Sequence, residues 1–249
     1  ETPVITWANP ADIVYGTPLG ATQLNATASV TGSFVYTPAA GTLLQAGART
    51  LSALFTPDDG AHYTTATAEV TLVVLPATPV ITWPDPAGIV YGTALGAAQL
   101  NATANVPGAF AYKPAAGTVL NVGTQPLAVA FTPTDAVNYE PTTAGASIVV
   151  SQATPVVTWA APSAIVFGTP LGAAQLNATA STAGAFVSSQ PAGTILGAGS
   201  HSLVVDFTPA DALNFTTASA SVQLSVLQAT PAITWASPAP ILHGTPLGP

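Results

Sequence analysis

Apolar and polar residues alternate along short stretches of this chain with a period of two. In residues 49–57 the side chains of Leu51, Ala53 and Phe55 fall on one face, and residues 68–74 alternate in the same way. This period is typical of strands with one buried face, and no window shows the 3.6-residue period of a helix. We therefore expect about seven short strands and no helices in the first 76 residues, at 3–7, 13–15, 23–29, 34–36, 42–44, 49–57 and 68–74.

The strand pattern recurs every 76 residues. Trp7, Trp83, Trp159 and Trp235 stand at this spacing. The phrase "GTPLGATQLNATA" at 16–28 returns almost unchanged at the same interval. Since internal repeats outweigh length as a guide to domains, we divide the chain by this period. The predicted domains are three complete repeats and the first strands of a fourth, at residues 1–76, 77–152, 153–228 and 229–249.

Seven short strands with one apolar face each bury those faces most economically in a two-sheet sandwich. Large side chains should anchor such thin cores: Trp7, Phe34, Phe55 and Tyr63, with their equivalents in later repeats. The recurring core residues are predicted to be Trp7, Trp83, Trp159, Phe55, Phe131 and Phe207. Proline-containing joints of a few residues should make the sandwiches a semi-rigid rod, because proline fixes the backbone.

Composition narrows the range of partners. Charged residues make up 5% of the chain, apolar residues 49%, and the net charge is −8. Nucleic-acid binding needs clustered Lys and Arg, and only Arg49 and Lys113 are present. The sequence also shows no apolar run long enough to insert in a membrane. We expect neither partner.

The residues at 15–19, 23–28, 55–57 and 59, together with Tyr63, give the chain a family resemblance. Their pattern resembles bacterial Ig-like domain repeats of large secreted and surface proteins, the mostly-β "YGT"-containing repeat modules. The resemblance covers the whole chain. It implies tandem Ig-like sandwiches in an extracellular or cell-surface spacer, stalk or adhesin, and it implies no particular ligand.

Residue types that carry out catalysis do not recur with the repeat. His62 aligns with Asn138 and Asn214, and His201 aligns with Arg49 and Gln125. We therefore expect no catalytic residues, no enzyme, no metal site and no cofactor, and we interpret the histidines as exposed loop residues. One acid recurs, as Asp59, Asp135 and Asp211. It should cap the turn after "FTP", with a weak calcium site at a joint as the alternative.

The one recurring chemical motif is the N-glycosylation sequon. Candidate acceptors are Asn25, Asn101, Asn177 and, outside the repeated phrase, Asn214. Alternation predicts that Asn25 and Thr27 face solvent. A polar strand face that never carries sugar is the competing interpretation.

The incomplete fourth repeat has two interpretations. Its apolar residues Ile233, Trp235, Ile241 and Leu247 either belong to a further covalent repeat or complete another subunit by strand exchange. The favoured function is a fibre, stalk or adhesin shaft that extends and self-associates. Its partners would be copies of itself or further repeats, with matrix or surface glycans as additional candidates. The alternative is an adhesin module that binds carbohydrate, ice or a host surface.

Overall fold

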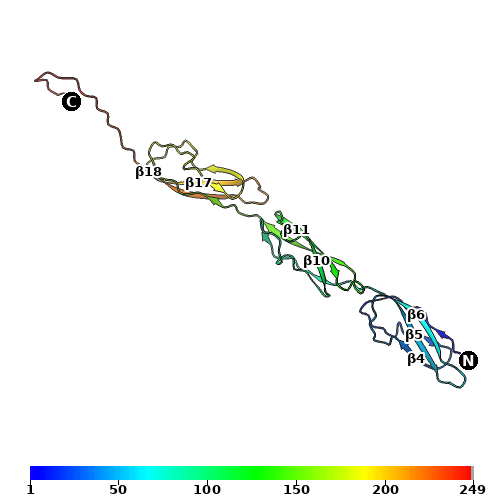
Figure 1. The fold of residues 1–249 in the computed structure, drawn as a ribbon. Coiled ribbons are helices and arrows are strands. Elements are labelled where there is room, and N and C mark those ends of the chain that lie inside the picture. Colours follow the sequence, from blue (N-terminus) through cyan, green and yellow to red (C-terminus); the bar gives the residue numbers. More distant parts are fainter. Residues whose placement is uncertain (248–249) are drawn as a thin grey trace. The chain divides into compact units, whose positions relative to one another are not determined.

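A computed structural model describes residues 1–247. The chain forms two compact units, Glu1–Ser151 and Gln152–Pro249, and each is described by itself. The first unit contains the first two sequence repeats, and the second contains the third repeat and the residues after it (Figure 1). All regular structure in the described residues is β, and no helix occurs among them.

Each repeat has six strands. In the first repeat a four-stranded sheet runs in the order β2-β6-β5-β4, and β1 pairs with β3 in a second, two-stranded sheet. β2 is parallel to β6, and the other pairs are antiparallel. The strands of this repeat are β1 (Ile5–Thr6), β2 (Ile13–Val14), β3 (Thr27–Ala28), β4 (Gly32–Thr37), β5 (Gly47–Pro57) and β6 (Ala66–Leu75).

The later repeats reproduce this topology. Their four-stranded sheets run β8-β12-β11-β10 and β14-β18-β17-β16, and their small sheets are β7-β9 and β13-β15. The second repeat consists of β7 (Ile81–Thr82), β8 (Ile89–Val90), β9 (Thr103–Ala104), β10 (Gly108–Lys113), β11 (Gly123–Pro133) and β12 (Thr142–Ser151). The third consists of β13 (Val157–Thr158), β14 (Ile165–Val166), β15 (Thr179–Ala180), β16 (Gly184–Ser188), β17 (Gly199–Pro209) and β18 (Ala218–Leu227).

The buried face of the large sheet in each repeat packs toward the small sheet. Three separate clusters of buried residues result, one within each repeat. In the first cluster Leu51 and Leu72 are fully buried on the paired strands β5 and β6. Trp7, next to β1, packs on this cluster from the other side. The fold is thus an all-β sandwich, as the alternation predicted.

The predicted anchor residues differ in depth. Phe55, Phe131 and Phe207 are each 1% exposed. Trp83 is buried, while Trp7 and Trp159 are half-buried. Each indole N–H donates to a backbone carbonyl, that of Gln23, Gln99 or Gln175. Tyr63 is half-buried, and Phe186, the third-repeat equivalent of Phe34, is exposed.

The expectation of a strand at 42–44 is wrong. This part of the chain is instead hydrogen-bonded to the loop that contains Leu19. The Leu19 N–H donates to the carbonyl of Thr42, and the Gly41 N–H donates to the carbonyl of Leu19. Those backbone groups are therefore satisfied without a ladder. Gly16, at the turn that leads into this loop, has a φ of 94°, which favours glycine.

The expected strands of the fourth repeat are also absent, since residues 228–247 form no strand. In the first repeat β1 pairs with β3 and β2 pairs with β6. Among the described residues after β18, the segments equivalent to β1 and β2 pair with no other strand.

Candidate functional site

Hydrogen bonds link the first two repeats at the joint between them. After β6 ends, the Ala77 N–H donates to the carbonyl of Asn138 at 2.9 Å. The carbonyl of Ala77 accepts from the Glu140 N–H at 3.1 Å. The connecting segment therefore adds a short parallel bridge beside Tyr139. The proline-containing joint is held by backbone hydrogen bonds as well as by fixed φ angles.

Asn138 is the central side chain of this joint and is only 5% exposed. Its Oδ1 accepts from the backbone N–H of Ala46 in the first repeat at 2.9 Å. Its Nδ2 donates to Oδ2 of Asp135 at 2.8 Å. Beside it, the rings of Tyr15 and Tyr139 meet edge-on with centroids 5.4 Å apart. The joint thus combines a satisfied buried amide with an aromatic contact between repeats.

The loop that carries Ala46 is fixed from inside its own repeat. Arg49 on β5 donates from its guanidinium to the carbonyl of Ala46 at 2.7 Å and from Nε to the carbonyl of Gln45 at 2.8 Å. In the second repeat Gln125 donates to the carbonyl of Asn121 at 3.1 Å. His201 Nε2 lies 2.7 Å from the carbonyl of Gly197 in the third.

Comparing residue types between the repeats could not predict this recurring donation to a loop carbonyl. Arg49, Gln125 and His201 share only a side-chain N–H donor placed four residues after the carbonyl that it binds. The expectation that every histidine is an exposed loop residue is wrong for His201. It is half-buried and lies on strand β17, just as Arg49 lies on β5 and Gln125 on β11.

The recurring aspartate caps its turn as predicted. Asp59 Oδ1 accepts from the backbone N–H groups of Ala61 and His62, and Asp135 and Asp211 act in the same way. Hydrogen bonds donated by the side chain and backbone of Asn138 hold the pKa of Asp135 below its ordinary value. Residues 1–247 contain no cluster of three or more His, Cys, Asp or Glu that could hold a metal ion.

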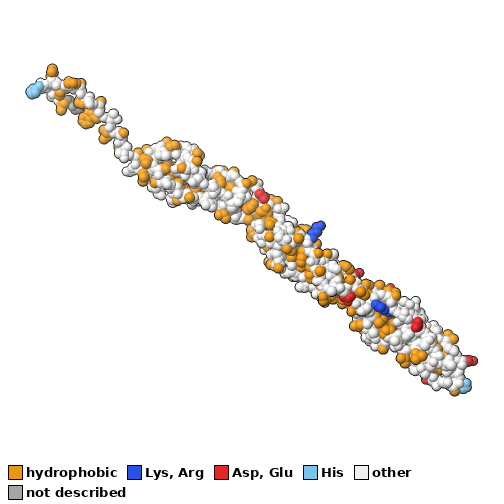
Figure 2. Space-filling view, viewed as in Figure 1, with side chains coloured by type: hydrophobic (Ala, Val, Ile, Leu, Met, Phe, Trp, Pro, Cys, Tyr) orange, Lys and Arg blue, Asp and Glu red, His pale blue; other side chains and the backbone are white. Residues whose placement is uncertain are grey.

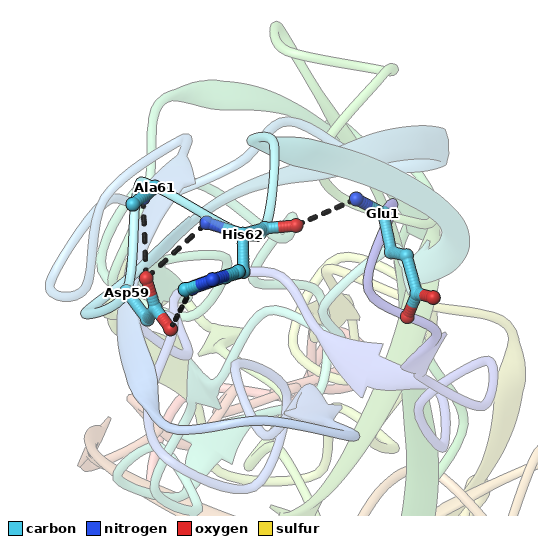
Figure 3. Close-up of polar contacts among 4 residues, drawn as sticks. All are labelled: Glu1, Asp59, Ala61 and His62. Carbon is cyan, nitrogen blue, oxygen red and sulfur yellow. Dashed lines mark hydrogen bonds and ion pairs between the residues drawn. The ribbon is translucent and has the colours of Figure 1, made fainter.

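The equivalent turn of the first repeat, Asp59–His62, lies beside the N-terminal residue Glu1 and is exposed. Figure 3 shows the His62 ring against Asp59, with Nδ1 2.8 Å from Oδ2. The amino nitrogen of Glu1 donates to the carbonyl of His62 at 2.6 Å. This end of the first repeat therefore repeats the internal bonding of the joint.

The sequons fall into two environments. Asn25, Asn101 and Asn177 are exposed. The hydroxyl groups of the following threonines, Thr27, Thr103 and Thr179, each donate to a carbonyl of the neighbouring short strand at 3.3 Å. Part of the repeated phrase thus has a structural role in closing the small sheet.

Asn214 differs from the other sequon asparagines. It is 5% exposed, and its Nδ2, the atom that would carry a glycan, donates to Asp211 at 2.8 Å. In the folded chain this nitrogen faces protein rather than solvent. Of the four predicted acceptors, Asn214 is therefore the least suited to carry sugar.

An apolar depression recurs in the first two repeats. In the first it has a volume of about 410 Å³ and lies between Leu24, Phe34 and Tyr36. In the second it has a volume of about 320 Å³ and is bordered by Leu100 and Tyr112. Apart from the tyrosine hydroxyl, its lining side chains are apolar, which differs from the convergent polar groups of a sugar site.

The apolar side chains of the partial fourth repeat are exposed. The exposed fractions of Ile233, Trp235, Ile241 and Leu247 are 89%, 86%, 58% and 86%. Elsewhere, Figure 2 shows hydrophobic side chains distributed over the visible surface, with few charged groups among them. Residues 1–247 contain no helix long and apolar enough to cross a bilayer.

Comparison with known proteins gives similarity in solved structures alone. No family model matches the sequence, and no curated protein matches it. A crystal structure of Drosophila N-cadherin EC1-4 is 12% identical, covers 92% of this chain and 73% of its own, and has a TM-score of 0.30. Sidekick-1 immunoglobulin domains 1-5 are 10% identical over 91% of this chain and 59% of theirs, with a TM-score of 0.31. Clostridium thermocellum CbhA fibronectin(III)-like modules are 15% identical over 60% of this chain and 95% of theirs, with a TM-score of 0.22. These similarities extend no further than the all-β fold.

Proposed function

We propose that this chain is a structural segment of an extracellular or cell-surface repeat protein. Its domains would be residues 1–76, 77–152 and 153–228, with 229–249 beginning another repeat of the bacterial Ig-like kind. The observation that carries the proposal is the joint at Asn138, where a buried amide and two tyrosine rings couple consecutive repeats. Such bonding suits a stiff spacer, because at this joint the first repeat is hydrogen-bonded to the second.

Self-association is the second part of the proposal. On the outer face of the first large sheet, Val35 and Leu54 are exposed neighbours on paired strands. Thr67 continues this row on β6 without a charge. Exposed apolar groups with few charges around them favour contact with another apolar surface. We name copies of this chain as the partner.

Electron microscopy of native material tests the structural role. We expect fibres or stalks with an axial repeat that corresponds to one or three sandwiches. Dispersed particles without such a repeat, at every concentration tested, would overturn the proposal. The intact mass of the same sample counts glycans, which we expect at Asn25, Asn101 and Asn177 if the host glycosylates this chain.

Sedimentation of the full chain over a concentration series tests self-association. Val35→Lys should shift the association to at least several-fold higher concentration, because it places a charge within the apolar row. The matched control is Leu43→Lys, an equally uncharged, exposed position in a loop of the same repeat. Equal effects of the two substitutions would contradict the assigned surface. Specific glycan binding by a strictly monomeric chain would instead favour the adhesin alternative.

A further inference from the structure

The turn Asp59–His62 corresponds to the turn that receives the first repeat in the joint. In that joint the carboxamide of Asn138 has two tasks. Its Nδ2 donates to Asp135 within the turn, and its Oδ1 accepts the Ala46 N–H from the preceding repeat. The side chain at this position therefore needs one donor directed inward and one acceptor directed at the neighbouring repeat.

Neutral His62 meets the same requirement with its two ring nitrogens. Nδ1 lies 2.8 Å from Oδ2 of Asp59, the distance that separates Asn138 Nδ2 from Asp135 Oδ2. An ionised carboxylate only accepts hydrogen bonds, so Nδ1 carries the proton in this pair. In the neutral ring Nε2 then retains its lone pair, so it is an available acceptor, as Oδ1 is in Asn138.

The backbone around His62 also reproduces the joint. Glu1 donates to the carbonyl of His62 and accepts from the Thr64 N–H at 2.9 Å, as Ala77 does with Asn138 and Glu140. A chain entering at Glu1 thus follows the path by which the first repeat enters the second. Glu1, Asp59, His62 and Tyr63 border a hollow of about 300 Å³ at this end.

We propose that these four residues form a docking surface for the end of another repeat of this kind, joined through Glu1. The proposal rests on the proposed role of the chain as one segment of a repeat series. In the docked state Nε2 of neutral His62 accepts the backbone N–H of the residue equivalent to Ala46, and Tyr63 meets the ring equivalent to Tyr15. A covalently joined repeat is the partner, because a separate chain would bring its own equivalent of Ala77 to the place that Glu1 already fills.

The test uses the full chain extended at Glu1 by a second copy of residues 1–76, with segmental isotope labelling. At pH 8 we expect a scalar coupling across the hydrogen bond between the Ala46 nitrogen of the added copy and Nε2 of the original His62. We also expect that amide to gain about tenfold protection from hydrogen exchange, relative to its intrinsic rate.

Two variants complete the test. In the extended chain at pH 8, His62→Asn should keep the protection, because asparagine fills this position in the second repeat, while His62→Ala should lose it. Equal protection of Ala46 with His62 and with His62→Ala at pH 8 would overturn the proposal. So would the same coupling between separate, unextended chains, because the partner would then be a second molecule. Absence of fibres in native material would remove the proposed function and leave these measurements unaffected.

Discussion

The ring of Tyr112 stands edge-on against Trp83, with centroids 5.4 Å apart and an interplanar angle of 67°. Its hydroxyl also accepts the backbone N–H of Ala102 at 2.9 Å. Trp7 and Tyr36 repeat the ring contact in the first repeat. In the third repeat the equivalent position is Ser188, a half-buried residue whose hydroxyl oxygen is buried and has no hydrogen-bond partner in the described structure. The third repeat therefore lacks the tyrosine ring that packs against the tryptophan in the first two repeats.

Ser188→Tyr should stabilise the third repeat. The new ring would cover Trp159 and Phe186, and an aromatic pair with the accompanying burial contributes about 1–2 kcal/mol. Hydrogen exchange of the central β17 amides measures the free energy of opening in this repeat. Ser188→Ala is the control, and it should stay within about 0.5 kcal/mol, because it removes an unsatisfied hydroxyl and adds no ring. A loss of stability on Ser188→Tyr would show that the third repeat has no room for the ring.

Gly108→Ala should destabilise the second repeat strongly. A Cβ at Gly108 would lie 2.5 Å from the carbonyl oxygen of Thr132 and 2.6 Å from Cε2 of Phe131. The phenylalanine is fully buried and cannot move aside, so we expect a loss of about 2–4 kcal/mol. Hydrogen exchange of the β11 core amides, which lie in the second repeat alone, measures it.

Gly96→Ala provides the matched control in the same repeat. The nearest atom to a Cβ there is Gln99 Oε1 at 3.9 Å, so we expect a change below about 1 kcal/mol. Similar losses for Gly96→Ala and Gly108→Ala would mean that backbone freedom, and not the contact with Phe131, governs these positions.

Local alternation was sufficient to predict the long strands. The expected segments 49–57 and 68–74 correspond to β5 and β6 within two residues at each end. A period of two is a property of each strand itself, so it is visible without knowing the partner. The segment 42–44 failed because its backbone groups bind a loop, and short alternation cannot distinguish a loop partner from a ladder.

The joint could not be predicted because its chemistry is conserved in role and not in residue type. His62 and Asn138 are different residue types, yet each places a side-chain N–H donor beside the turn aspartate. Arg49 and Gln125 likewise share only a donor and the carbonyl they reach. The acceptors of Arg49 and Gln125 are backbone carbonyls, which every residue has and which therefore leave no mark in the sequence.

Asn138→Ala should uncouple the first two repeats. The substitution leaves the Ala46 N–H without its acceptor and Oδ2 of Asp135 without its side-chain donor, at a cost of about 1–3 kcal/mol. We expect the Ala46 amide to exchange at least tenfold faster, while the core amides of β5 change little. Asn177→Ala, at an exposed position, should leave both sets of amides unchanged. Unaltered exchange at Ala46 in Asn138→Ala would contradict the assigned coupling.

Asp135→Asn should change how the second repeat responds to acid. Because hydrogen bonds from Asn138 lower the pKa of Asp135 in the folded state, its contribution to stability is present above the ordinary aspartate pKa near 4 and is lost as the pH falls through the lower folded value. Asparagine also presents an NH₂ where the Asn138 amide needs an acceptor. The variant should therefore be less stable than the natural chain at pH 7, and the difference should shrink as the pH falls below the ordinary aspartate pKa. Hydrogen exchange of the β11 core amides at several pH values below 7, corrected for intrinsic rates, measures this difference in stability.

Asp206→Asn on the exposed face of β17 is the control and should leave the second repeat unchanged. A difference that stays constant across this pH range would mean that Asp135 stabilises the turn by shape alone, without its charge.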